Sequence, residues 1–239
     1  MDQLLIALDV DTAEHALGLA DALRGTAHAF KIGSQLFTAE GPDIVRRLAA
    51  YGDRVFLDLK FHDIPNTVAG AVEAATSLGV WMLNVHAAGG AGMMQAAREA
   101  AHATAARERR PAPLVIAVTV LTSMDETSLA ASGVGTPVLD QVVRLAQLAR
   151  GAGLDGVVAS PQETALIRSQ CGASFTIVTP GIRGGGAAQV KKDDQARPMS
   201  AAEAVAAGAN YIVVGRPIIE AADPRRAALA ILETLKPGH

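Results

Sequence analysis

Short apolar runs rich in β-branched residues recur along the chain, and stretches with helical periodicity lie between them. These runs predict eight strands, at residues 4–10, 29–33, 54–60, 81–86, 114–121, 156–160, 175–180 and 211–215. Strands that alternate with helical segments are typical of βαβ units, in which a helix crosses over between two parallel strands. The pattern therefore predicts a parallel sheet.

Helix boundary signals support the same organisation. The segments 42–52 and 137–151 each begin with proline and end at glycine, which are the residues favoured at a helix start and just past a helix end. Ser200 and Glu203 have the spacing of a capping box, and Asp223 before a proline predicts a further helix start. Each predicted strand is thus followed by a helical segment.

Eight strand–helix units, with no linker or composition shift between them, predict a closed (β/α)8 TIM barrel that spans residues 1–239 as a single domain. The alternative is an open doubly wound sheet. No predicted strand is followed by the G-x-G-x-x-G turn that often accompanies that architecture, so the barrel is favoured.

The composition supports a globular chain and argues against a nucleic-acid partner. Half of the 239 residues are hydrophobic and 19% are charged, which supplies ample material for a core. The formal net charge is only -3 and aromatic residues make up 3%, whereas nucleic-acid binders are usually basic and often carry stacking aromatics. We therefore expect a small-molecule substrate.

The cysteine count and the hydropathy pattern predict a cytoplasmic protein with no membrane contact. The single Cys171 excludes an internal disulfide and a zinc site built from cysteines. The first residues lack the basic region of a signal peptide. Residues 74–97 carry no formal charge, but several glycines divide this stretch into helix, strand and loop rather than a membrane span.

Polar residues at the predicted strand ends are the strongest indication of function. Enzymes with this barrel carry their chemistry at the carboxyl ends of the strands. The ends of the first five predicted strands hold residues that are unusual for buried strands, namely Asp9, Lys31, Asp58, Lys60, Asn84, His86 and Thr122. A lone polar residue here is often only a turn or cap residue, but five strand ends together predict a site.

The third predicted strand sharpens this expectation. Because side chains alternate across a strand, Asp58 and Lys60 share the face of Phe56 and point to the barrel mouth, while Leu57 and Leu59 face the outer helices. Acidic neighbours favour a protonated Lys60, which suits a proton donor better than a Schiff-base nucleophile. The alternative is an ion-pair network that only fills the barrel.

Two glycine-containing loops near the end of the chain predict a phosphate site. "TPGIRGGG" at 179–186 and "GRPI" at 215–218 follow the last two strands, where barrels of this type commonly bind phosphate. Gly181 and Gly215 allow backbone N–H groups to approach an anion, and Arg183 and Arg216 supply charge. The Gly-rich, charged residues up to 198 predict a mobile loop that closes over the phosphate, so we assign 181–198 as the phosphate-binding loop.

A metal site is conceivable near the third and fourth strands, where His62 and His86 accompany the carboxylates. However, Lys60 lies where a metal ion would have to bind, and its positive charge repels a second cation. We therefore expect no metal ligand.

Several motifs together resemble the bacterial type of the orotidine 5'-phosphate decarboxylase family. They are "LDV" at 8–10, "KIG" at 31–33, "DLKFHDIPNT" at 58–67, "LTS" at 121–123, "TPGIR" at 179–183 and "GRPI" at 215–218, and they cover nearly the whole chain in order. The D-x-K-x-x-D core alone also resembles magnesium-dependent sugar-phosphate decarboxylases and aldolases on the same barrel, which is the alternative function.

The resemblance implies the conversion of orotidine 5'-phosphate to UMP and CO₂ without a cofactor, in pyrimidine biosynthesis. It implies that Lys60 protonates C6 of the pyrimidine, with Asp58, Asp63 and Lys31 completing the charged array. It also implies a homodimer in which Asp63, Ile64 and Thr67 reach the neighbouring subunit's site. The implied substrate contacts are Asp9 and Lys31 to the ribose, Thr122 or Ser123 to the pyrimidine, and Pro180, Arg183, Gln195, Gly215 and Arg216 around the phosphate.

Overall fold

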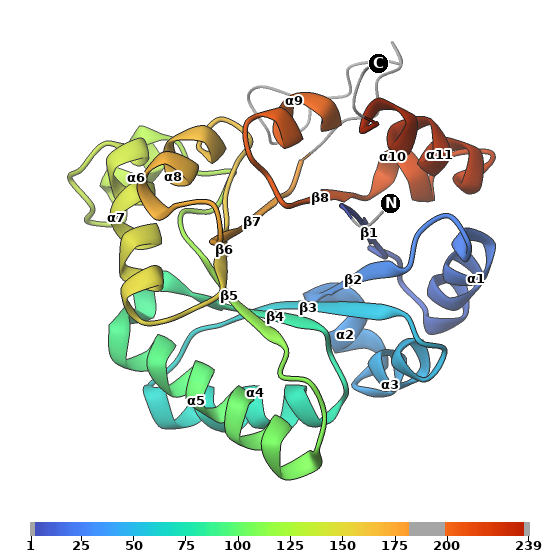
Figure 1. Cartoon of the computed structure of the whole chain (residues 1–239), viewed down its shortest axis with the longest axis horizontal. Helices are drawn as coiled ribbons and strands as arrows, with labels where there is room; N and C mark the ends of the chain where they lie inside the picture. The colour runs from blue at the N-terminus through green and yellow to red at the C-terminus, as the bar shows by residue number, and fades with distance from the viewer. Residues whose placement is uncertain (1–2, 182–198, 237–239) are drawn as a thin grey trace.

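A closed ring of eight parallel strands forms the centre of the molecule, and helices surround it (Figure 1). The structure is a computed structural model and describes residues 3–181 and 199–236. The strands are β1 Leu4–Ala7, β2 Ala29–Gly33, β3 Arg54–Phe61, β4 Met82–His86, β5 Leu114–Val118, β6 Gly156–Val158, β7 Thr176–Thr179 and β8 Tyr211–Val214. Each pairs with the next in parallel, and β8 pairs with β1 to close the ring. The predicted (β/α)8 barrel in a single domain is confirmed.

At least one helix follows every strand, as the sequence predicted. The α-helices are α1 Ala13–Leu23, α2 Ser34–Glu40, α3 Asp43–Ala50, α4 Pro65–Ser77, α5 Gly90–Glu108, α6 Glu126–Ala131, α7 Val138–Gly151, α8 Thr164–Cys171, α9 Ala201–Ala206, α10 Arg216–Ile219 and α11 Pro224–Thr234, with a 3₁₀ turn, η1, at Ala87–Gly89. None of the helices in the described part of the chain is long and apolar enough to cross a membrane.

The predicted helix starts form with the expected chemistry. At α9, the Ser200 hydroxyl accepts the Glu203 N–H while the Glu203 carboxylate accepts the Ser200 N–H, which is a complete capping box. At α11, Asp223 accepts the N–H of Arg226 at 2.9 Å, and a proline occupies the first helical position. Local sequence therefore sets where these helices begin.

Two apolar layers hold the barrel together. A small cluster fills the inside of the ring and contains Leu5, Ala7, Ala29, Phe56, Met82, Ile116, Val178 and Val213. A much larger cluster lies between the outer faces of the strands and the helices, and Leu57 is part of it at 1% exposure. Successive side chains of a strand thus enter different layers. On β3, Phe56 lies in the inner cluster and Leu57 in the outer one, as the alternation along this strand predicted.

Most strands end earlier than their apolar runs do. Pairing of β1 ends at Ala7 and that of β5 at Val118, whereas their runs extend to Val10 and Leu121. Leu8, Val10 and Val120 are still buried after the strand has ended. The predicted carboxyl-side ends of β1, β5, β6, β7 and β8 were therefore too long, because apolar residues continue into the loops at the mouth of the barrel, whereas those of β2 and β4 were correct.

Candidate active site

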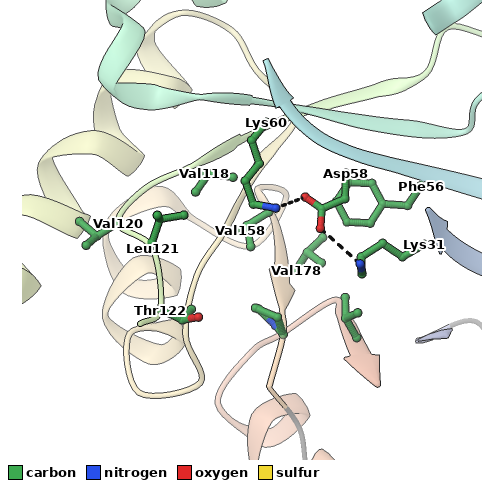
Figure 2. Close-up of a pocket in the computed structure, with 12 residues that line it drawn as sticks. Lys31, Phe56, Asp58, Lys60, Val118, Val120, Leu121, Thr122, Val158 and Val178 are labelled. Carbon is green, nitrogen blue, oxygen red and sulfur yellow. Dashed lines mark hydrogen bonds and ion pairs between the residues drawn. The ribbon is translucent and has the colours of Figure 1, made fainter. Parts of the chain in front are cut away.

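Four charged side chains meet at the carboxyl end of the barrel: Asp58 and Lys60 from β3, Lys31 from β2 and Asp9 from the loop after β1. The Lys60 ammonium lies 2.7 Å from Asp58 Oδ1, and the Lys31 ammonium lies 3.6 Å from Asp58 Oδ2. Lys31 also donates to Asp9 Oδ1 at 2.9 Å. Figure 2 shows the two lysines approaching the Asp58 carboxylate from opposite sides. The structure therefore brings together the charged residues that the sequence placed at the first three strand ends.

An irregularity in β3 gives Lys60 its position. The pairing of β3 with β4 shifts register between Leu57 and Phe61, and Lys60 itself has a positive φ of 53°. A residue with a side chain rarely adopts this backbone conformation, and its occurrence often marks a functional site. Simple alternation predicted that Lys60 continues the face of Asp58. The two side chains do meet, but through a bulge rather than through a regular strand.

The surroundings of Asp58 favour its ionised form. Its side chain is only 15% exposed, and burial on its own raises the pKa of a carboxyl group. The charges of Lys31 and Lys60, together with hydrogen bonds from Lys60 and Asn84, outweigh burial and hold the pKa of Asp58 below its ordinary value. The cluster therefore holds a fixed negative charge between two ammonium groups.

Apolar side chains form the opposite wall of the cavity beside this cluster. Val118, Val120 and Leu121 come from β5 and the loop after it, and Val158, Val178 and Val213 come from the next three strands. Figure 2 shows several of these side chains facing the lysine–aspartate cluster. An apolar wall lowers the local dielectric constant and strengthens electrostatic interactions within the cavity. Motif reasoning missed these residues, although the inward position of Val118 could have been read from the alternation along β5.

Some of the predicted substrate-binding residues line this cavity and others do not. Thr122 and Pro180 line it, whereas Ser123 is not among the lining residues. Gly215 lies close to Ala7 and Asp9, since a Cβ at this glycine would be 3.8 Å from Asp9 Oδ2.

The predicted phosphate site is only partly within the described chain. Gly181 has a positive φ of 79°, as expected for a turn glycine, whereas Gly215 does not adopt the left-handed region. Arg216 is exposed at the first position of α10. Arg183, Gln195 and residues 182–198 of the predicted phosphate-binding loop lie outside the described residues.

The three residues expected to reach a partner subunit lie together at the start of α4. Asp63, Ile64 and Thr67 are all exposed, and Ile64 is 66% exposed despite being apolar. The Asp63 carboxylate accepts the N–H of Ile64 at 2.6 Å. Their role in a dimer stays a prediction.

His62 and His86 stack on each other beside the cluster, with ring centroids 5.2 Å apart and an interplanar angle of 17°. Burial, and then the charges of His62 and Lys60, lower the pKa of His86. The Nδ1 atom of His86 accepts the N–H of Ala88 at 3.4 Å, which also suits a neutral ring. Within residues 3–181 and 199–236, no three His, Cys, Asp or Glu side chains gather so that they could hold a metal ion.

A (β/α)8 barrel with a charged cluster and a cavity at the carboxyl ends of its strands is the arrangement of a barrel enzyme. Comparison with known families identifies which one. The chain belongs to the orotidine 5'-phosphate decarboxylase / HUMPS family, whose sequence model matches residues 2–231.

Individual relatives agree with this assignment. The chain is 56% identical to the orotidine 5'-phosphate decarboxylase of Alkalilimnicola ehrlichii, over 97% of this chain and 94% of that protein. It is 54% identical to the enzyme of the same name from Moorella thermoacetica, over 96% of this chain and 90% of that protein. The crystal structure of orotidine 5'-phosphate decarboxylase from Lactobacillus acidophilus superimposes with a TM-score of 0.85 at 35% identity, covering 99% of this chain and 100% of that chain.

Proposed function

We propose that the protein decarboxylates orotidine 5'-phosphate to UMP and CO₂ in pyrimidine biosynthesis, with Lys60 as the proton donor. Family membership and the names of relatives at 54–56% identity support the reaction. The observation that carries the residue assignment is the Lys60 ammonium, 2.7 Å from Asp58 and facing the cavity. Asp58 and Lys31 complete the array around it.

The geometry suits a reaction that leaves an electron pair on a ring carbon. When the bond between C6 and the carboxylate breaks, CO₂ departs and its bonding electrons stay on C6. The Lys60 ammonium stabilises this developing charge and then transfers a proton to C6, which yields the C6–H bond of UMP. Lys60 regains a proton from water. Asp58 orients the ammonium through its 2.7 Å contact and lies near the departing carboxylate.

The remaining substrate contacts follow from the sequence motifs. We assign Asp9 and Lys31 to the ribose and Thr122 or Ser123 to the pyrimidine. The 2.9 Å contact between Lys31 and Asp9, and the place of Thr122 in the cavity wall, support these assignments. Pro180, Gly215 and Arg216 follow the adjacent strands β7 and β8, which suits a shared phosphate site. The roles of Arg183, Gln195 and the loop 181–198 rest on the sequence alone.

We assign the exposed residues Asp63, Ile64 and Thr67 to the site of a second copy of the chain. A large apolar side chain that is 66% exposed next to a charged group is well suited to burial in an interface. On this proposal the functional unit is a homodimer in the cytoplasm.

The alternative is a magnesium-dependent sugar-phosphate decarboxylase or aldolase. The names of the relatives do not favour it. The charges also oppose it, because a divalent cation at Asp58 would lie beside the ammonium groups 2.7 and 3.6 Å from that carboxylate.

The loss of orotate absorbance on incubation with orotidine 5'-phosphate, with and without EDTA, tests the proposal. We expect the same rapid loss in both samples. A loss that EDTA abolishes would favour the magnesium-dependent alternative, and tight nucleotide binding without any loss would indicate a non-catalytic barrel.

A further inference from the structure

Asn84 on β4 is an inward-facing polar residue with no accessible surface. Its inward neighbour on the same strand, Met82, and its partner on β5, Ile116, are apolar and equally buried. An apolar residue would satisfy packing at this point of the barrel. Burying an amide is unfavourable unless its donor and acceptor atoms find partners, so the partners of Asn84 indicate why it is there.

The nitrogen and the oxygen of the Asn84 side-chain amide each form a hydrogen bond with a residue of the charged cluster. Its Nδ2 donates to Asp58 Oδ1 at 2.7 Å, and its Oδ1 accepts the backbone N–H of Lys60 at 2.8 Å. Asp58 Oδ1 is also the atom that receives the Lys60 ammonium. One amide therefore contacts the backbone of Lys60 directly and its ammonium through Asp58.

The backbone contact falls where β3 is irregular. Lys60 has a φ of 53°, in the left-handed region that disfavours any residue with a Cβ, and the β3–β4 register shifts around it. Asn84 Oδ1 takes the position that a ladder partner would have for the Lys60 N–H. Such a conformation persists only where the surrounding structure holds it.

We propose that Asn84 is a positioning residue for the decarboxylation, holding the Lys60 backbone and the Asp58 carboxylate so that the Lys60 ammonium stays at C6. The inference rests on the proposed function. A lysine side chain has many rotamers, and fixing both its backbone and the acceptor of its ammonium removes most of that freedom. Because proton donation depends strongly on distance, Asn84 acts on turnover rather than on substrate binding.

Replacing Asn84 by aspartate should make turnover depend on pH in a way that wild-type turnover does not. The introduced carboxyl group would lie beside Asp58, with Lys60 from β3, Lys31 from β2 and His86 from β4 as the nearby titratable groups. Strand β5 contributes only apolar side chains there. Two adjacent carboxylates share a proton at low pH, and the introduced carboxyl group, while protonated, donates to Asp58 as the amide does. At higher pH the donor is lost and the carboxylates repel.

The experiment measures kcat and KM from pH 5 to pH 9 for the wild type, Asn84→Ala and Asn84→Asp. We expect Asn84→Ala to lower kcat by about 10²-fold and to change KM less than about threefold. We expect the ratio of Asn84→Asp to wild-type kcat to fall at least about tenfold as the pH rises, because the proton shared with Asp58 is lost.

Asn210→Asp is the matched control at the opposite end of the barrel. Asn210 Oδ1 accepts the Ile177 N–H and an Arg168 N–H, and an aspartate can accept both. We expect this variant to keep the wild-type kcat and pH profile.

Three outcomes would overturn the inference. They are an Asn84→Ala kcat within about threefold of wild type, a pH-independent Asn84→Asp ratio, or failure of both Asn84 variants to fold at any pH while Asn210→Asp folds. The last outcome would mean that the amide serves the fold alone. A wild type without decarboxylase activity would instead contradict the proposed function, so the two failures are distinguishable.

Discussion

At the amino end of the barrel, Asp155 and Asn210 each bond to a backbone N–H of a neighbouring strand, whereas at the carboxyl end Asp58 bonds to side chains. Asp155 accepts the N–H of Val115 at 2.7 Å, just before β6 begins, and Asn210 accepts that of Ile177 at 2.8 Å, just before β8 begins. Asp58 instead contacts two ammonium groups and an amide. The two aspartates, Asp155 and Asp58, therefore have different kinds of partner at the two ends.

Arg168 extends the contrast. From α8, its guanidinium donates to the backbone oxygens of Gly172, Ala173, Phe175 and Gly208 and to the side chain of Asn210. These contacts join the loops that lead into β7 and β8. Because these contacts hold two backbone segments together, we expect this end of the barrel to contribute to stability. The paired charges at the other end face a cavity and are available to a substrate.

Among the substitutions that compare the two ends of the barrel, the largest effect is expected for Asp58→Asn, an isosteric change that removes the charge between the two lysines. We expect kcat/KM to fall about 10²–10³-fold, because the preorganised array loses its central anion and the orientation of the Lys60 ammonium. Steady-state kinetics with orotidine 5'-phosphate measures it. A change of less than about threefold would contradict a catalytic role for the carboxyl end.

The lowered pKa of Asp58 predicts that the difference in unfolding free energy between the wild type and Asp58→Asn depends on pH. Because folding lowers the pKa of Asp58 from its ordinary value of 3.8, its charge stabilises the fold fully above that value, and this stabilisation is lost as the pH falls through the folded-state pKa. Denaturant unfolding of the wild type and Asp58→Asn between pH 3 and pH 7 measures it. The gap between their unfolding free energies should shrink on acidification, and a gap that widens would contradict the assignment.

At the amino end, Arg168→Met should affect stability and spare catalysis. The substitution removes the donor of five acceptors and should lower the unfolding free energy by about 3–5 kcal/mol, since each bond contributes about 1 kcal/mol net. The kcat of the folded enzyme should remain within about twofold of wild type. A large loss of kcat in folded protein would mean that the two ends are not separate in function.

The smallest effect is expected for Asp155→Asn, the amino-end counterpart of Asp58→Asn. An amide oxygen can still accept the Val115 N–H, so we expect unchanged kcat and a stability loss below about 1 kcal/mol. Thermal unfolding and the decarboxylase assay together measure this. An activity loss comparable with that of Asp58→Asn would remove the contrast between the two ends.

The sequence predicted the barrel because alternation of strand and helix patterns is a local property. It predicted the cluster for a related reason, since Asp58, Lys60 and Lys31 are unusual residues at strand ends. The strand limits were less accurate because Val10 and Val120 stay buried after pairing has stopped. The hydrophobic pattern along the chain indicates which residues are buried. It does not indicate where the hydrogen-bonded pairing of a strand stops.

The bulge at Lys60 could not be predicted. Left-handed backbone is usually marked by glycine or asparagine, and neither occurs there. From the sequence, Asn84 could be identified only as a polar residue at a strand end. Its two hydrogen-bond partners could not be predicted, because they depend on the shifted register between β3 and β4. Contacts that arise from tertiary register leave no local pattern in the chain.

The central claim is that the Lys60 ammonium performs the proton transfer, and turnover of Lys60→Ala tests it most directly. The matched control is Lys236→Ala, a lysine that is 67% exposed and pairs with Glu233 on the surface. We expect Lys60→Ala to lose at least about 10³-fold in kcat while still binding UMP, and Lys236→Ala to match the wild type. A Lys60→Ala enzyme that keeps more than about a tenth of wild-type turnover would contradict the account.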